Sequence, residues 1–200
     1  MKFIRFIVCI LSVFFLVSCN KTSVKRIDNG DIVDFSGYWN STDSRLVAET
    51  MIRESVDHPW VHEYMQKKEK KPVVVVGLVH NKTAEHINTE TFIKELERAF
   101  INSSNIKVVA GVTQRPELRE EVRRMQDNAS PETMKKVRNE TGADYMLMGV
   151  VNDIVDAQGR SKVQFYQVNL ELIHLESHIK AWVGQKKISK VIKKKRFGIF

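Results

Sequence analysis

The strongest constraint on the fold is a run of five valines between residues 73 and 79. β-Branched side chains favour extended backbone, so the run predicts a β-strand that begins after Pro72 and ends near Asn81. The side chains are apolar on both faces of that strand, which is typical of a strand in the interior of a sheet. We therefore expect a central strand with neighbours on both sides.

Helical patterns precede this strand. Apolar residues recur at helical spacing after three candidate N-caps, Ser41, Thr42 and Asp43. The apolar positions are Leu46, Val47, Met51 and Ile52. Pro59 is expected to break or kink this helix. One or two further turns are indicated by Trp60, Val61, Tyr64 and Met65.

A second helix is expected to begin at Asn88, with Glu90 in its first turn and Ile87 packed on Phe92. Its buried stripe comprises Phe92, Ile93, Leu96, Ala99 and Phe100. Further along, the patterns indicate a short strand over 106–110, a charged helix over 114–127, and another helix that starts at Ser130-Pro131-Glu132 and ends at Gly142.

The last third of the chain predicts three long strands, over residues 145–155, 162–175 and 179–191, with turns at 156–159 and 176–177. In the middle strand the apolar positions change from odd to even numbers, so one face cannot hold them all. We expect a β-bulge near Tyr166 and Gln167 to restore the register.

The order of these elements predicts a single α/β domain over residues 35–191, with helices packed on a mixed, mainly antiparallel sheet. Residues 192–200 are expected to form a basic C-terminal tail. The net charge is +8. Seven cations lie between Lys186 and Arg196 with no acid among them, so the basicity is expected to belong to the tail and not to the domain.

The basic tail has two interpretations. Its mixture of lysines with Ile and Phe residues can lie on an anionic membrane leaflet or on another acidic polymer of the cell envelope. The simpler interpretation is the end of a strand followed by a solvated basic peptide.

The N-terminal segment predicts export. Lys2 and Arg5 precede an apolar run over residues 6–17, which is too short to span a membrane as a helix. The sequence Leu16-Val17-Ser18-Cys19 then resembles the lipobox of bacterial lipoproteins. In that class the chain is cut before the cysteine, whose thiol receives a diacylglycerol. The alternative is a secreted protein in which Cys19 is incidental.

The resemblance places signal cleavage between Ser18 and Cys19, so residues 1–18 are a signal peptide and residues 19–34 a lipid-anchored tether. Fully extended, that tether reaches about 50 Å. Asn20, in place of the Asp that retains lipoproteins at the inner membrane, favours the outer membrane.

Composition excludes some chemistry. The chain has two cysteines, of which Cys9 leaves with the signal and Cys19 carries the lipid, so the mature domain has no disulfide, catalytic cysteine or Cys-rich metal site. His58 and His62 have the i,i+4 spacing of a zinc pair, but Pro59 separates them and no Glu follows His58.

The other histidines are expected in loops and turns: His80, His86, His174 and His178. No nucleophile elbow, P-loop or dinucleotide-binding glycine motif occurs in the sequence. We therefore expect a protein that is not an enzyme and that uses no cofactor and no metal.

From Asp34 to Val191 the chain resembles the LpoB family, outer-membrane lipoproteins that activate bifunctional penicillin-binding proteins. As a set the matching segments are specific. They are residues 37–40 (Gly-Tyr-Trp-Asn), 42–44 (Thr-Asp-Ser), 71–77, 88–90 (Asn-Thr-Glu), 140–147, 165–168 (Phe-Tyr-Gln-Val) and 182–185 (Trp-Val-Gly-Gln).

The resemblance implies an α/β domain similar to the N-terminal domain of TolB, with no chemistry of its own. It implies a periplasmic domain that docks on a small non-catalytic domain of the synthase and promotes glycan polymerisation and cross-linking. It implies a protein partner and membrane attachment at Cys19, with no nucleic acid and no small-molecule substrate. The alternative is a structural or assembly lipoprotein, such as a secretion-complex component, with the same fold.

The tether is shorter than in the best-known member of that family. From the outer membrane it brings the domain to a synthase only if that synthase extends outward. Partner-binding residues are not indicated by the sequence, although exposed aromatic side chains are the usual anchors of protein interfaces. Trp60, Tyr64 and Tyr166 are the candidates to examine.

The first prediction concerns Cys19. Cells that produce the wild-type protein and are fed a labelled fatty acid should incorporate the label, and the Cys19→Ala variant should not, because its side chain has no thiol for the diacylglycerol. Gel fluorography of the purified proteins measures the difference. Equal labelling of the two forms would contradict lipidation at this residue.

Overall fold

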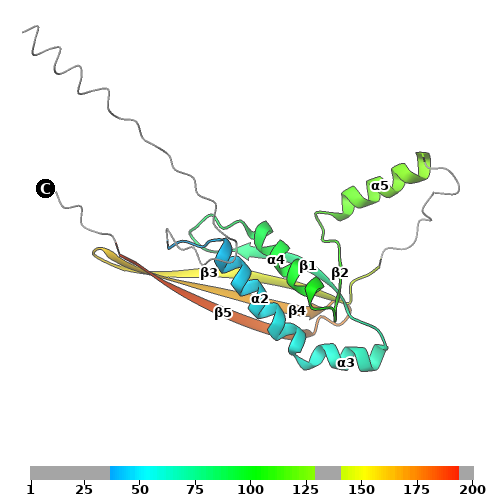
Figure 1. The fold of residues 1–200 in the computed structure, drawn as a ribbon, viewed down its shortest axis with the longest axis horizontal. Coiled ribbons are helices and arrows are strands. Elements are labelled where there is room, and N and C mark those ends of the chain that lie inside the picture. The colour runs from blue at the N-terminus through cyan, green and yellow to red at the C-terminus, as the bar shows by residue number, and fades with distance from the viewer. Residues whose placement is uncertain (1–36, 129–140, 194–200) are drawn as a thin grey trace, which may run out of the picture. The chain divides into compact units, whose positions relative to one another are not determined.

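A computed structural model describes residues 37–128 and 141–193, which contain a five-stranded sheet and four helices (Figure 1). The strands are β1 (Val73–Asn81), β2 (Lys107–Val109), β3 (Tyr145–Gln158), β4 (Ser161–His174) and β5 (Lys180–Lys193). The helices are α2 (Ser41–Asp57), α3 (Pro59–Lys68), α4 (Thr89–Asn102) and α5 (Arg115–Asn128). None of these helices has the length and apolarity needed to cross a membrane.

The sheet has the order β2-β1-β3-β4-β5 and is mixed, as predicted. β1 pairs in parallel with both β2 and β3, which places the valine-rich strand inside the sheet. The longer ladders, β3 with β4 and β4 with β5, are antiparallel. The predicted α/β class with helices packed on a mixed, mainly antiparallel sheet is confirmed.

Two helices, α2 and α4, lie on the same face of the sheet and against each other (Figure 1). The core forms between them and the strands. From α4 it takes the fully buried Phe92, Leu96 and Phe100, and from α2 it takes Val47, Ala48, Met51 and Ile52. The sheet contributes residues that include Val74, Leu147, Val168, Leu170 and Leu172. Burying each large apolar side chain contributes about 1.5–3 kcal/mol.

The helix ends follow local chemistry. α4 is capped by the predicted residue, because the Asn88 side chain accepts a hydrogen bond from the backbone N–H of Thr91 at 3.1 Å. The predicted caps of α2 are wrong. Asn40 is the N-cap, and Asp43 completes a capping box by accepting from the Asn40 backbone N–H at 3.0 Å. Pro59 separates α2 from α3, as expected.

The strands correct two further expectations. β4 pairs with β3 without a register shift, so no bulge occurs near Tyr166, and the one shift against β5 lies between Leu172 and Ile173. The odd-numbered apolar residues of β4 simply face away from the helices, and Phe165 among them is exposed. The β3–β4 turn is shorter than predicted, because residues 156–158 belong to β3 and only Gly159 and Arg160 connect the strands.

The basic segment is also different from expectation. Lys186, Lys187, Lys190 and Lys193 all lie on β5, so much of the basicity belongs to the sheet and not to a tail. β5 also includes residues 192 and 193, which the sequence assigned to the tail. The helix expected to start at Ser130 lies outside the described residues, as do the segments expected to be the signal peptide and the tether.

A buried ion pair joins the start of α2 to β5. The Lys190 Nζ lies 2.6 Å from the Asp43 Oδ2 and donates a second hydrogen bond, of 2.9 Å, to the Tyr38 carbonyl oxygen. Both ionic side chains are buried. Residues 37–40, which we name the lead-in segment, are therefore fastened to the far end of β5.

Gly184 allows close packing at the other end of the same strand. A Cβ at this position would overlap the six-membered ring of Trp182 and lie 3.2 Å from the Met51 Cε. Gly184→Ala should therefore lower the free energy of unfolding by about 1–3 kcal/mol, measured by urea denaturation. Gly142→Ala is the matched control, because nothing lies within 4 Å of a Cβ there. Equal effects of the two substitutions would contradict this packing.

The ion pair gives a third prediction. Lys190→Met leaves the Asp43 carboxylate buried without its cation, so the free energy of unfolding should fall by about 3–5 kcal/mol. Lys180→Met is the control, since Lys180 forms a 2.8 Å ion pair with Glu171 that is largely exposed, and it should cost below about 1 kcal/mol. The double variant Asp43→Asn/Lys190→Met should be more stable than Lys190→Met alone. Chemical denaturation of the four proteins measures these differences.

Candidate functional site

In the described part of the chain, no helix covers the second face of the antiparallel strands. Side chains alternate between the two faces of a strand, so odd-numbered residues of β4 and even-numbered residues of β3 share this uncovered face. The β4–β5 register places the odd-numbered residues from Val183 to Val191 on the same face. This surface is the candidate site for a protein partner, because a buried core is not available to one.

An apolar cluster occupies the uncovered face near the start of β3. We name it the proximal patch, and it consists of Met146, Met148, Ile173 and Val183. The Val183 side chain is 58% exposed, and the other three residues are partly buried. Glu171 lies between Met148 and Val183 in the register and forms an ion pair with Lys180. Protein interfaces combine apolar side chains with polar and charged ones.

A row of amides divides the uncovered face. The Asn169 Oδ1 accepts hydrogen bonds from the Gln167 Nε2 at 3.2 Å and from the Gln185 Nε2 at 3.0 Å. Asn152 lies opposite Gln167 in the register. Beyond this row lies a second apolar cluster, the tip patch, formed by Ile154, Phe165 and Val191.

The helix-covered side contains a polar network around Glu85, which lies in the loop between β1 and α4. The Glu85 Oε1 accepts a hydrogen bond from the Tyr166 hydroxyl at 2.7 Å and another from the Gln164 Nε2. The Glu85 Oε2 accepts from the Trp39 backbone N–H at 3.1 Å. Burial, followed by the hydrogen bond to Glu85, raises the pKa of the Tyr166 hydroxyl far above its usual range.

The network joins two of the sequence segments that resemble the LpoB family, residues 37–40 and residues 165–168. The Trp39 ring packs edge-on against Tyr166 with a centroid separation of 5.5 Å and against Phe92 at 6.1 Å. Its indole N–H donates to the Ser44 Oγ at 2.8 Å. The network therefore holds the lead-in segment on the domain. The polar groups of the network form hydrogen bonds with one another. Sequence reasoning did not identify Glu85.

The aromatic candidates for partner binding are not available. Trp60, Tyr64 and Tyr166 are all buried. Trp60 and Tyr64 pack on Tyr145 beside a groove of about 630 Å³ under α3. Burial raises the pKa of the Tyr145 hydroxyl, so this residue stays neutral in the groove. The ring of His174, which was expected to be exposed, is half-buried and lies 5.0 Å from that of Tyr145.

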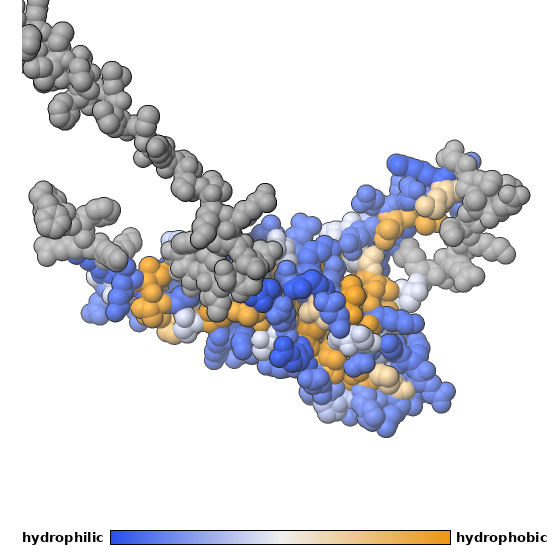
Figure 2. All heavy atoms as spheres, viewed as in Figure 1, coloured by the Kyte–Doolittle hydropathy of each residue, from blue (hydrophilic) through white to orange (hydrophobic). Residues whose placement is uncertain are grey.

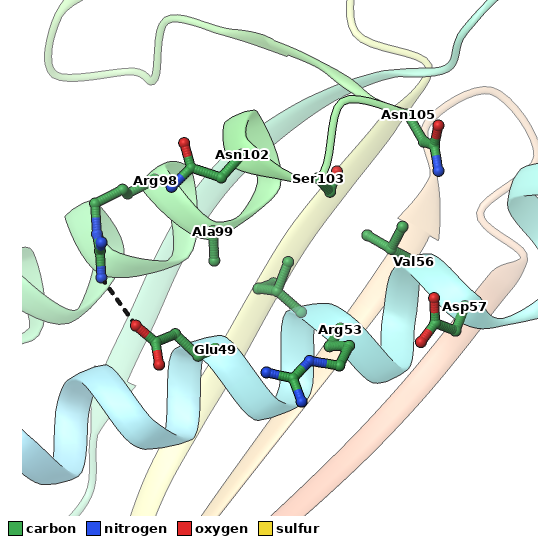
Figure 3. A pocket seen from close by; sticks show the side chains of 10 residues that line it. Glu49, Arg53, Val56, Asp57, Arg98, Ala99, Asn102, Ser103 and Asn105 are labelled. Carbon is green, nitrogen blue, oxygen red and sulfur yellow. Dashed lines mark hydrogen bonds and ion pairs between the residues drawn. The ribbon is translucent and has the colours of Figure 1, made fainter.

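A second cleft, of about 410 Å³, separates α2 from α4 (Figure 3). Its walls carry charged and amide side chains from both helices, and Arg98 of α4 reaches across to Glu49 of α2 at 3.2 Å. Arg53, Asp57 and Asn102 also line it. Charges of both signs line the cleft, and one pair joins its two walls, which is typical of a solvated contact between helices.

The histidine candidates remain apart. His58 caps α3 and His62 lies within it, and both are exposed, as are His80, His86 and His178. Within residues 37–128 and 141–193, no three His, Cys, Asp or Glu side chains lie close enough together to hold a metal ion. Ser18 and Cys19, the predicted cleavage and lipidation residues, lie outside the described ranges.

The chain is similar to solved structures at low identity. The C-terminal domain of LpoB from Escherichia coli is 13% identical, with a TM-score of 0.45, and the match covers 74% of this chain and 99% of that domain. Lipoprotein GNA1162 from Neisseria meningitidis is 14% identical, with a TM-score of 0.41 and coverages of 63% and 88%. No curated protein matches the chain.

The family profile described as peptidoglycan-synthase activator LpoB matches residues 43–188. The match begins at Asp43 of the capping box in α2 and ends at Ile188 in β5, so it includes the helices and all five strands described above. It covers well over half of the sequence. The chain therefore belongs to the LpoB family of peptidoglycan-synthase activators, a family of regulators and not of enzymes.

Proposed function

We propose that this chain is a lipid-anchored periplasmic regulator that binds a bifunctional penicillin-binding protein and promotes peptidoglycan synthesis. The observation that carries the proposal is the family match over residues 43–188, which spans the folded domain from α2 to β5. The family's description as a synthase activator supports the class of partner. The lipobox-like segment ending at Cys19 supports attachment of the mature chain to the outer membrane.

The proximal patch is the surface that we assign to the synthase. Val183 is apolar and more than half exposed near the start of β5, an edge strand of the sheet, where the ladder with β4 fixes its backbone. Met146 and Met148 lie on the same face two strands away, on β3, and methionine side chains adapt readily to the shape of a partner. Burying such a patch contributes about 25 cal/mol for each Å² of apolar surface removed from water.

Activation follows from differential affinity. A regulator without chemistry of its own raises a synthase's activity only if it binds the active conformation more tightly than the inactive one. A tenfold difference in affinity corresponds to about 1.4 kcal/mol and shifts the conformational equilibrium tenfold when the regulator is saturating. The proximal patch is expected to supply that difference by contacts that form only with the active conformation.

Reach limits where the complex can form. The tether spans about 50 Å at full extension. The eight residue-to-residue steps of β5 from Val191 to Val183 add about 26 Å along the sheet. The proximal patch therefore lies at most roughly 75 Å from the lipid, so the synthase must present a domain that extends toward the outer membrane.

Val183→Glu tests the assignment. The substitution places a charge on the proximal patch and should weaken binding to a bifunctional synthase from the same cell at least about tenfold, because a buried unpaired charge is costly. Ile101→Glu on α4 is the matched control, since Ile101 is 60% exposed but lies away from the sheet. The affinities are measured as binding of the full-length lipidated protein, in detergent, to synthase immobilised on a surface.

Three results are informative. Binding of the wild type and of Ile101→Glu, with loss in Val183→Glu, agrees with the proposal. Equal binding of all three proteins contradicts the assigned surface. If the wild type binds no synthase at micromolar concentration and instead recovers secretion components from envelope extracts, the chain has an assembly role and the proposed function is wrong.

A further inference from the structure

We propose that the tip of the sheet docks on a phospholipid surface that carries anionic headgroups. The tip is the end where β3 turns into β4, together with the last residues of β5. The inference uses the proposed lipid anchor at Cys19 and goes beyond the proposed function by assigning an orientation to the anchored domain.

Apolar side chains are exposed on both faces of the tip. On the uncovered face Ile154 is 71% exposed, Val191 64% and Phe165 43%, and on the opposite face Val155 is also exposed. Hydrophobic residues gather at this end of the sheet in Figure 2. Exposed apolar residues in such a group mark a site of interaction, and residues on both faces of a strand end are suited to insertion between headgroups.

Charge at the tip is predominantly positive. Arg160 is exposed in the turn, Lys162 follows it, and Lys193 ends β5 beside them, because Ser161 pairs with Lys193 in the register. Two acids lie in the same segment, Asp156 opposite Val163 and Asp153 opposite Tyr166. Each cation near an anionic leaflet contributes about 1 kcal/mol to binding, which is about fivefold in the docking equilibrium.

The chain leading from the anchor enters the domain at this end. A Cβ on Gly37 would overlap the Ile192 side chain, and the Lys162 Nζ lies 5.1 Å from the centre of the Tyr38 ring. The hydrogen bond from Lys190 to the Tyr38 carbonyl fixes the same placement. A lipid on Cys19 is thus joined by a short tether to the tip itself, which gives the tip a high effective concentration at its own membrane.

Lipid explains both properties of the tip, whereas an acidic polymer would require the cations alone and leave Ile154, Val155 and Val191 unexplained. With the tip on the membrane, the proximal patch lies about 26 Å further along β5 and away from the lipid. The docked domain would then present Val183 to a partner that approaches from the periplasm.

The test places an environment-sensitive fluorophore on the full-length lipidated protein. The mature chain has one cysteine, Cys19, whose thiol is used by the lipid, so a single introduced cysteine can be labelled. Ile154→Cys carries the label at the tip, and Val183→Cys carries it in the proximal patch as the matched control. The proteins are reconstituted into phosphatidylethanolamine vesicles with or without phosphatidylglycerol, and quenching by brominated lipids is measured.

We expect the label at residue 154 to be quenched in vesicles that contain phosphatidylglycerol, and the label at residue 183 not to be. Adding Arg160→Gln and Lys193→Gln should lower the docked-to-undocked ratio by about fivefold for each charge, whereas Lys67→Gln with Lys68→Gln on α3 should leave it unchanged. High salt should also lower the docked-to-undocked ratio, as the substitutions at Arg160 and Lys193 do, because salt screens the attraction between these cations and the anionic headgroups. Circular dichroism confirms that the variants are folded.

Flotation of the same vesicles separates docking from anchoring. Protein that floats while residue 154 stays unquenched overturns the docking and leaves the anchor and the synthase proposal intact. Binding to purified peptidoglycan without quenching by lipid assigns the tip to an acidic polymer and likewise overturns it. Protein that does not float overturns the anchor, and the docking with it, because the tip is proposed to act at the concentration that the anchor provides.

Discussion

The buried ion pair between Lys190 and Asp43 is the interaction on which the arrangement of this domain depends. It joins the N-terminal end of α2 to β5 and, through the Tyr38 carbonyl, holds the lead-in segment at the tip of the sheet. Removing either charge would leave the other buried, so the pair is costly to break. Because of it, the lead-in segment and the proximal patch lie at opposite ends of the same strands.

The two faces of the sheet have different roles. The face under α2 and α4 forms the core and contains the Glu85 network, whose polar groups are occupied in holding Trp39 and Tyr166 in place. The uncovered face carries the proximal patch, an amide row and the tip patch in that order along the strands. Binding of a partner without any reaction of its own is the function that such a surface supports.

Sequence patterns predicted most of the elements, because local chemistry sets them. Asn88 caps α4 and Pro59 separates two helices through interactions within a few residues. The errors arose where distant contacts decide. From the sequence alone, Lys190 belongs to a basic run, and only the fold shows its ion pair with Asp43, 147 residues away. Likewise, Glu85 is an ordinary loop residue in the sequence, and only the fold shows its hydrogen bond from Tyr166. Which face of β4 is covered also cannot be read from its own residues.

The most direct test of this two-ended account is photo-crosslinking in living cells, with a photoreactive amino acid at residue 183 or at residue 154. The account predicts that the protein with the probe at residue 183 captures a bifunctional penicillin-binding protein. It predicts that the probe at residue 154, in the tip patch, captures no synthase. Capture of the synthase from residue 154 but not from residue 183 would contradict the account.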